Sequence, residues 1–408
     1  MKSVDAHLEG ILRAVAPLPP LPLPLADAHN CVLAEDVVAS FPLPSFDNSA
    51  MDGYAVRAAD VAQARPDAPV VLPVIADIAA GSSADVHIQP GVCARIMTGA
   101  PLPTGADAVV PQEDTDQGHP RVGIVRAPQP GQHVRRAGED LPSGGLVLSA
   151  GTYLGAPQIG LLAAAGRATL LCRPRPRAVV VSTGSELVEA GEPLGRGQIH
   201  DSNSHLLTAA AREAGAMAFR VGVVPDDHRR LLDALEDHLI RADLVITSGG
   251  VSVGAYDVTK EVLSRLGTVA FDKVAMQPGM PQGFGHLGAE RTPIFTLPGN
   301  PVSAMVSFEV FVRPAIRRML GAQNVLRPQV TVQTTENVRS SPGKRSFLRA
   351  VVEREPGGRL VARQAGGQGS HVLSSMAAAN ALLVVPEQLT EVAAGSSLTA
   401  LLLERRAG

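Results

Sequence analysis

The sequence contains no tryptophan, only 3% aromatic residues, and three cysteines among 408 residues. Three widely separated cysteines fit neither a disulfide framework nor a cysteine-based metal cluster, so a reducing compartment is the simplest interpretation and we expect a cytoplasmic protein. The formal net charge is only −3, with 36 basic and 39 acidic residues scattered along the chain. This balance argues against a nucleic-acid partner.

Other familiar signatures are also absent. No apolar run approaches the roughly 20 residues that span a bilayer, and the N-terminus lacks a signal-peptide core, so we expect no membrane partner. No P-loop, Gly-x-Ser-x-Gly or His-Glu-x-x-His motif occurs, which excludes the enzyme classes that those motifs define. The hydrophobic share of 45% is nevertheless sufficient for several cores, and the length predicts roughly two to four domains.

The first 173 residues read as a helical part that is interrupted by a β-rich insertion. An amphipathic helical pattern near the N-terminus is followed by a proline-rich stretch at 17–24, which we interpret as a stiff connector, and by an expected helix over 26–39. Residues 41–140 carry short β-like runs broken by Pro and Gly, and helical character returns at 151–168. We therefore assign 1–40 and 141–173 to the helical part and 41–140 to the insertion.

The second half alternates strands and helices before turning β-like. After a linker at 173–177, expected helices at 204–214, 228–241 and 302–320 separate apolar strands, a pattern that predicts a parallel sheet covered on both faces. Residues from 327 onward carry strand patterns and turn signals that predict a small barrel or sandwich. The domains of this half are therefore 174–326, an α/β domain, and 327–408, a β domain.

Three apolar runs in the α/β domain end in small polar residues and glycines. Residues 178–182 lead into Thr183 and Gly184, residues 243–247 lead into a serine- and glycine-rich run at 248–254, and residues 294–297 lead into Pro298 and Gly299. Carboxyl ends of parallel strands meet at one edge of a sheet, and glycines let the backbone approach a ligand closely. The pattern predicts one pocket for a phosphate-bearing or oxyanionic ligand.

Several acids lie near these runs, and each has a structural as well as a functional interpretation. Asp47 and Asp52 suit either a turn or a metal-assisted site, because hard cations prefer oxygen ligands. Asp201 could bind a ligand or cap the following helix, and the same choice applies to Asp226 and Asp257. Lys273 could act in the site or simply be a solvated strand residue. His371 lies in a loop and has no assigned role.

Taken together, the ordered motifs resemble those of the MoeA/gephyrin-E family, the molybdopterin molybdenumtransferases. The resemblance runs essentially from end to end. It rests on segments 47–54 (DNSAMDGY), 97–101 (MTGAP), 138–140 (GED), 182–187 (STGSEL), 248–254 (SGGVSVG), 297–303 (LPGNPVS) and 368–371 (QGSH).

This resemblance implies a fold, a reaction and an assembly. The expected fold is a multidomain α/β protein with a three-layer molybdopterin-binding domain, a helical part, a β-rich insertion and a C-terminal β-barrel, assembled as a homodimer. The implied reaction inserts molybdate into adenylylated molybdopterin, hydrolyses the adenylate and releases molybdenum cofactor and AMP, with Mg²⁺ as cofactor. A related implication is a gephyrin-like scaffold that binds a partner peptide between the α/β and C-terminal domains, with a footprint around Phe308, Phe311 and residues 327–340. The helical spacing of the two phenylalanines favours core packing instead. A molybdopterin adenylyltransferase would need only the α/β domain, so the insertion argues against it.

The resemblance also assigns roles by position, with the β-rich residues completing the site across the dimer. The implied catalytic residues are Asp52, Thr98, Asp140, Glu186, Asp257 and Lys273, and Glu186 and Asp226 are the implied Mg²⁺ ligands. The implied substrate-binding residues are Ser182, Thr183, Gly184, Asp226, Ser248, Gly249, Gly250, Ser252, Gly254, Pro298, Gly299, Asn300, Pro301, Arg349 and Ser370.

One segment departs from the family pattern. Relatives often carry Lys-Pro-Gly-Lys-Pro before the Leu-Pro-Gly-Asn-Pro motif, whereas Gln277 and Met280 occupy the two lysine positions here. We expect the oxyanion site to depend instead on Lys273, on arginines such as Arg345 and Arg349, and on backbone N–H groups.

Overall fold

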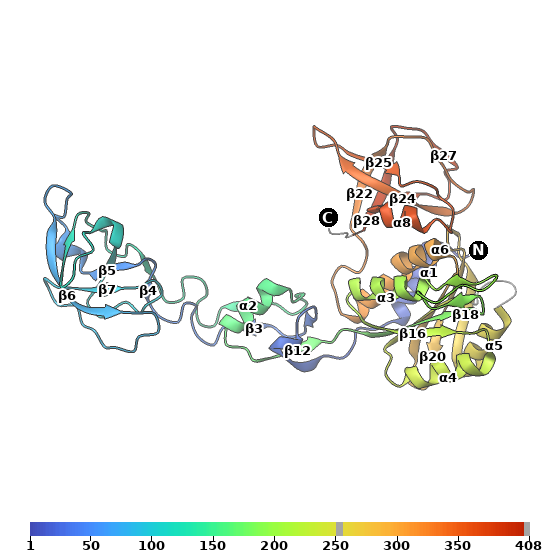
Figure 1. The fold of residues 1–408 in the computed structure, drawn as a ribbon, viewed down its shortest axis with the longest axis horizontal. Coiled ribbons are helices and arrows are strands. Elements are labelled where there is room, and N and C mark those ends of the chain that lie inside the picture. Colours follow the sequence, from blue (N-terminus) through green and yellow to red (C-terminus); the bar gives the residue numbers. More distant parts are fainter. Residues whose placement is uncertain (250–255, 404–408) are drawn as a thin grey trace.

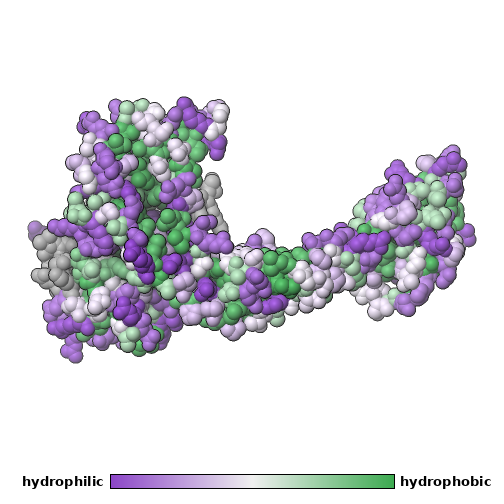
Figure 2. Space-filling view, turned by 180° about the vertical axis from the view of Figure 1, so that it is seen from behind, coloured by the Kyte–Doolittle hydropathy of each residue, from purple (hydrophilic) through white to green (hydrophobic). Residues whose placement is uncertain are grey.

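The computed structural model describes residues 1–249 and 256–403, which form an elongated molecule (Figure 1). A β-rich module occupies one end, a small helical part lies in the middle, and the α/β module occupies the other end with the C-terminal barrel packed on it. The space-filling view shows a slender arm joined to two stacked lobes, with apolar residues gathered where the lobes meet (Figure 2). Among the described residues no helix is long and apolar enough to cross a membrane.

The β-rich module is built on a five-stranded sheet of order β8-β5-β7-β6-β9, with its own buried core around Tyr54, Val110 and Ile124. Cys93 is part of this core, and burial raises the pKa of its thiol to about 12. The elements are β4 (Asn48–Ser49), β5 (Gly53–Val56), η2 (Ala58–Val61), β6 (Val70–Ile78), β7 (Cys93–Ile96), β8 (Ala108–Pro111), η3 (Gln112–Asp114), β9 (Arg121–Ile124) and β10 (Val134–Arg135).

The middle part differs from the sequence expectation. The helix expected over 26–39 is wrong: this stretch holds a short 3-10 turn and two short strands, and Asn30 has φ of 66°, a conformation that a helix cannot contain. The proline-rich stretch also contributes a strand, because Leu21–Pro24 pairs with Thr169–Arg173. The elements are β1 (Leu21–Pro24), η1 (Leu25–Asp27), β2 (Val32–Leu33), β3 (Val37–Val38), β11 (Leu146–Leu148), α2 (Ala156–Ala164) and β12 (Thr169–Arg173).

Helix α1 (Val4–Ala14) packs on the α/β module rather than on the middle part to which we had assigned residues 1–40. Val4 and Ile11 belong to the α/β core, and the buried ring of His7 meets Phe311 edge-on at 4.8 Å between ring centroids. The apolar face of this amphipathic helix therefore packs against residues more than 300 positions later in the sequence. The local sequence pattern predicts the helix but not the surface that it packs on.

The α/β module is a three-layer structure with the sheet order β16-β13-β17-β21-β20-β18. Strands β16, β13, β17 and β21 are parallel, while β20 and β18 are antiparallel additions. The elements are β13 (Arg177–Thr183), β14 (Leu187–Val188), β15 (Ile199–His200), α3 (Asn203–Glu213), β16 (Met217–Val224), α4 (His228–Leu239), β17 (Leu244–Ser248), α5 (Tyr256–Leu266), β18 (Gly267–Lys273), β20 (Pro281–Leu287), β21 (Thr292–Leu297), α6 (Pro301–Ser307), η4 (Phe308–Val312) and α7 (Arg313–Met319).

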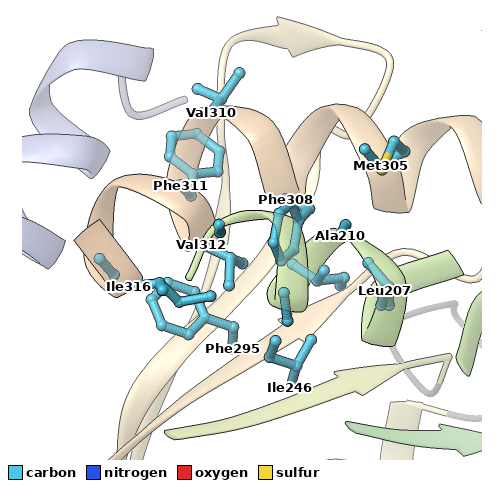
Figure 3. Packing of buried hydrophobic residues seen from close by; sticks show 14 of the residues in the cluster. Leu207, Ala210, Ile246, Phe295, Met305, Phe308, Val310, Phe311, Val312 and Ile316 are labelled. Carbon is cyan, nitrogen blue, oxygen red and sulfur yellow. The ribbon is translucent and has the colours of Figure 1, made fainter. Parts of the chain in front are cut away.

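The helix expected over 302–320 forms, but a π-helical turn interrupts it at η4. Pro314 lacks a backbone N–H and its ring crowds the carbonyl of residue 310, which accounts for the widened turn. Phe308 and Phe311 from this turn pack with Phe295 and Ile246 of the sheet beneath (Figure 3). Burying each large apolar side chain contributes about 1.5–3 kcal/mol, so these residues anchor the layer that covers the sheet.

The C-terminal module is a closed five-stranded barrel, as expected. Strands follow the order β24-β25-β22-β28-β26, and an additional β24–β26 pairing closes the ring. The short strand β19, from the α/β segment, extends the sheet by pairing with β24. The elements are β19 (Met276–Gln277), β22 (Gln329–Thr334), β23 (Val338–Arg339), β24 (Arg345–Arg354), β25 (Leu360–Gln364), α8 (Leu373–Ala378), β26 (Ala381–Val385), β27 (Glu391–Val392) and β28 (Ser397–Leu402).

Candidate active site

A cavity of about 640 Å³ opens at the carboxyl ends of β13, β17 and β21. The chain leaves β13 toward β16 on one side and later returns to β17 on the other, and ligands of such sheets bind at this change of direction. The lining residues are Ser182, Thr183, Gly184, Glu186, Leu187, Ile199, His200, Asp201, Ser202, Asn203, Asp226, Ser248, Gly249, Pro281, Pro298, Gly299, Asn300, Pro301 and His371.

The loop after β13 forms one wall of the cavity. A Cβ on Gly184 would lie 2.7 Å from Oε2 of Glu186, so the Glu186 side chain packs directly against this glycine. The Glu186 carboxylate is therefore folded back over the loop at the cavity wall. Beneath it, Ser182 Oγ and Thr183 Oγ1 are buried and have no hydrogen-bond partner in residues 1–249 and 256–403, so both hydroxyls can serve a bound ligand.

The loops after β17 and β21 interlock with that wall. Gly249 has φ of 98°, and a Cβ there would overlap the carbonyl oxygen of Thr183. Its N–H donates to Leu297 O at 3.2 Å, and its Cα lies 3.8 Å from the position that a Cβ on Gly299 would occupy. Only glycine adopts this geometry without strain, so the glycine pattern reports close backbone packing around the cavity.

Among the described residues three carboxylates line the cavity, those of Glu186, Asp201 and Asp226, and their contacts differ. Asp201 is 2% exposed and accepts from Ser204 N–H at 3.1 Å and from Ser204 Oγ, so the helix-cap interpretation of Asp201 is confirmed. Asp226 faces the cavity, whereas its neighbour Asp227 caps α4 by accepting from two backbone N–H groups, and these bonds lower the pKa of Asp227. Within the described part of the chain no Lys or Arg lines the cavity.

The C-terminal barrel supplies the remaining wall. Asn300 Nδ2 donates to Ser370 Oγ at 3.1 Å, and Val302 N–H donates to Ser370 O at 3.1 Å, which docks the barrel loop onto the start of α6. His371, from the same loop, lines the cavity. Ser370 thus reaches the site through Asn300, and His371 is a cavity residue to which the sequence had given no role.

Arg349 does not lie where a substrate ligand would. It is completely buried, and burial lowers the pKa of its guanidinium. The guanidinium donates to Gly367 O at 2.9 Å and Gly369 O at 3.0 Å, and to Ser375 Oγ at 3.2 Å. In this structure Arg349 holds the barrel loop in shape instead of lining the cavity.

The other expected cations also lie elsewhere. Lys273 ends β18, two strands away from β21, and its exposed side chain is not part of the cavity lining. Arg345 is bidentate to Asp5 with both contacts at 2.7 Å. Gln277 accepts from Ser341 Oγ of the barrel module. The segment that carries Gln277 and Met280 contributes Pro281 to the cavity lining.

The candidate residues of the β-rich module form a separate group. Thr98 donates to Asp52 Oδ1 through its N–H at 2.7 Å and its hydroxyl at 2.8 Å, and these bonds lower the pKa of Asp52. Asp47 is paired with Arg136 at 2.6 Å, so the turn interpretation holds for this acid.

Asp140 lies on the connection back to the middle part, where its N–H donates to Leu43 O at 3.1 Å. Within one chain these residues lie in modules distant from the cavity (Figure 1). The predictions for Gly250, Ser252 and Gly254 fall outside the described residues, as does the side chain of Asp257, whose backbone belongs to α5.

Asn203 is a further cavity residue to which the sequence assigned no role. Its Nδ2 donates to Ser248 Oγ at 2.8 Å and to Gly299 O at 2.6 Å, and its buried Oδ1 has no hydrogen-bond partner among the described residues. Asn203 lies two residues after Asp201, for which the sequence left a helix cap and a ligand-binding role open. Its position directly before a helix at the sheet edge was the signal available.

Comparisons with known proteins agree with this architecture. The MoeA N-terminal region (domain I and II) matches residues 2–166, the probable molybdopterin binding domain matches 179–318, and the MoeA C-terminal region (domain IV) matches 331–403. The chain is 48% identical to molybdopterin molybdenumtransferase 2 of Mycobacterium tuberculosis over 98% of both chains. It is 38% identical to the molybdopterin molybdenumtransferase of Haemophilus influenzae over 92% of both.

A solved structure of the molybdopterin biosynthesis moeA protein from Pyrococcus horikoshii OT3 superposes with a TM-score of 0.76 at 30% identity, covering 98% of this chain and 100% of that one. Similarity at this level extends through all four parts of the molecule, the cavity and the β-rich insertion included. The chain therefore belongs to the MoeA family of molybdopterin molybdenumtransferases.

Proposed function

We propose that this chain inserts molybdate into adenylylated molybdopterin and hydrolyses the adenylate, giving molybdenum cofactor and AMP. The observation that carries the proposal is the glycine-walled cavity at the strand ends, in a chain that matches molybdopterin molybdenumtransferases over almost its full length. Backbone groups at Gly184, Gly249 and Gly299 let a phosphate chain approach the sheet edge closely. The buried hydroxyls of Ser182 and Thr183 then accept hydrogen bonds from the bound ligand or donate hydrogen bonds to it.

A divalent cation fits this cavity. Glu186 and Asp226 both line it, neither forms an ion pair with a described Lys or Arg, and an anionic ligand would meet their negative charge with no described Lys or Arg to offset it. In proteins Mg²⁺ usually binds to one or two carboxylates together with water and substrate phosphates, so two carboxylates are sufficient. In the described part of the chain no cluster of three metal-binding side chains exists. We therefore propose Glu186 and Asp226 as Mg²⁺ ligands; the ion would neutralise charge on the phosphoryl oxygens.

We further propose that a second copy of the chain completes the site. Asp52, Thr98 and Asp140 lie far from the cavity of their own chain, on a module that projects away from it (Figure 1). A homodimer that brings this module to the partner's cavity would unite the two groups. Mixing Asp52→Ala protein with Asp226→Ala protein should then regenerate some active sites, and no recovery after demonstrated subunit exchange would mean that each site is built within one chain.

A peptide-binding scaffold is less well supported. Its expected footprint included Phe308 and Phe311, which are 1% and 0% exposed and pack in the α/β core (Figure 3). A cytoplasmic location stays a prediction, to be checked by cell fractionation.

The experiment that tests the proposed reaction is a reconstitution with purified protein, adenylylated molybdopterin, Mg²⁺ and molybdate. We expect AMP and active cofactor to form only when molybdate is present. Parallel reactions with tungstate measure oxyanion preference. Replacing Gln277 and Met280 by lysine should lower the molybdate concentration that gives half-maximal turnover, and an unchanged concentration would place these two positions outside the oxyanion site.

A further inference from the structure

Asn203 is the first residue of α3, and its side chain joins two loops that are remote in sequence. Nδ2 lies 2.8 Å from Ser248 Oγ and 2.6 Å from Gly299 O. The orientation of the amide follows from chemistry, because a backbone carbonyl oxygen accepts only and the group 2.6 Å away must therefore be the NH₂. Both donor hydrogens of the amide are thus used, one on each loop.

The same two loops are joined again through Ser248. Its hydroxyl accepts from Asn203 and donates to Pro298 O at 3.4 Å, while Gly249 N–H donates to Leu297 O at 3.2 Å. Asn203 itself is held firmly, because the buried Asp201 carboxylate accepts from the next residue of the helix. Helix α3 therefore provides a fixed point from which one side chain sets the spacing between the ends of β17 and β21.

We propose that Asn203 is a positioning residue that fixes the opening between the Ser248–Gly249 loop and the Pro298–Gly299 loop, and thereby sets the affinity of the cavity for its phosphate-bearing substrate. The inference deepens the proposed function and rests on it. Backbone groups of both loops face the cavity, so a change in their spacing alters substrate binding before it alters the chemical step. Local pattern cannot show this role, since the partners lie 45 and 96 residues away.

The informative variant is Asn203→Asp, which keeps the shape of the side chain and removes both donors. An oxygen would then face the Gly299 carbonyl at a distance set for a hydrogen bond, so the two loops must separate. The matched control is Asn380→Asp in the barrel. Asn380 Nδ2 likewise donates to a backbone carbonyl, Val352 O, at 2.9 Å, and Asn380 is not among the residues that line the cavity.

Two measurements decide the matter. In the AMP-release assay we expect Asn203→Asp to raise KM for adenylylated molybdopterin about tenfold, with kcat changed much less, while Asn380→Asp leaves KM unchanged and lowers Tm. Hydrogen exchange followed by mass spectrometry, which needs no substrate, should show faster exchange at 248–249 and 298–302 in Asn203→Asp only.

Unchanged exchange in both loops would overturn the proposal, whether or not the protein releases AMP. An unchanged KM with a lowered Tm would also overturn it, because Asn203 would then act as Asn380 does. If wild-type protein released no AMP but the loops of Asn203→Asp exchanged faster, the positioning role would stand and the proposed reaction would fail.

Discussion

Gly249 offers the sharpest test of how the cavity is built, because a second glycine has the same φ but no close neighbours. Gly249 has φ of 98° and Gly191 has φ of 97°. A Cβ on Gly249 would overlap Thr183 O and lie 3.0 Å from Thr183 Oγ1, whereas a Cβ on Gly191 would meet nothing within 4 Å. Comparing Gly249→Ala with Gly191→Ala therefore separates the contact from the backbone strain.

The expected losses of stability follow from the backbone strain and from the steric overlap. Placing alanine at positive φ costs about 1–2 kcal/mol, and this is the whole effect that we expect for Gly191→Ala. Gly249→Ala adds an overlap with backbone, which no rotamer change relieves, and overpacking of this kind costs about 1–3 kcal/mol more. If the loop moves to relieve the overlap, a displacement on the order of 1 Å can lower turnover about 100-fold.

Urea unfolding of the two variants, together with kcat/KM for AMP release, measures both consequences. We expect Gly249→Ala to lose more stability than Gly191→Ala, or to keep stability and lose activity because its loop has moved. Equal losses of stability with wild-type kcat/KM in both variants would refute the packing of Gly249 against Thr183.

Further predictions concern stability and activity elsewhere. Burial lowers the pKa of His7 from 6.5 to about 4, so between these pH values the unfolded chain binds more protons than the folded chain. The free energy of unfolding should therefore fall as the pH drops from about 6.5 to 4. In urea titrations at several pH values, His7→Gln should flatten this dependence. Glu309 and Arg327 form a buried ion pair at 2.9 Å, and Glu309→Gln should lower the unfolding free energy, by up to about 3–5 kcal/mol, because it removes the negative charge that faces a buried guanidinium. Asp52→Asn should lower AMP release strongly while Tm stays near the wild-type value, since the carboxylate is exposed; a large fall in Tm would assign it a structural role.

Local chemistry explains which features could be predicted from the sequence. Short apolar runs ending in glycine predicted the strand-end loops, and the structure places Thr183, Gly249 and Gly299 at one cavity. The helices at 204–214 and 228–241 formed within two residues of their expected ends. Periodicity and turn residues act over a few positions, and these elements depend on nothing more.

The features that escaped prediction depend on contacts between distant segments. Arg349 carries a charge that suggests a ligand-binding residue, yet the fold buries it under a loop 18–20 residues further along the chain. From the sequence, Asn203 is only a residue at the start of a helix. Its role becomes visible when the fold brings Ser248 and Gly299 within hydrogen-bond distance of its side chain. The N-terminal helix has the right pattern, but the pattern does not say that its partner is Phe311.

The central claim is that the cavity at the ends of β13, β17 and β21 carries out molybdate-dependent release of AMP. Single-turnover AMP release, measured for wild-type and Glu186→Gln protein side by side, tests it most directly. Wild-type protein should release AMP only when molybdate is present, and Glu186→Gln should lose most of this activity without a change in Tm. AMP release that ignores molybdate, or a Glu186→Gln protein as active as the wild type, would contradict it.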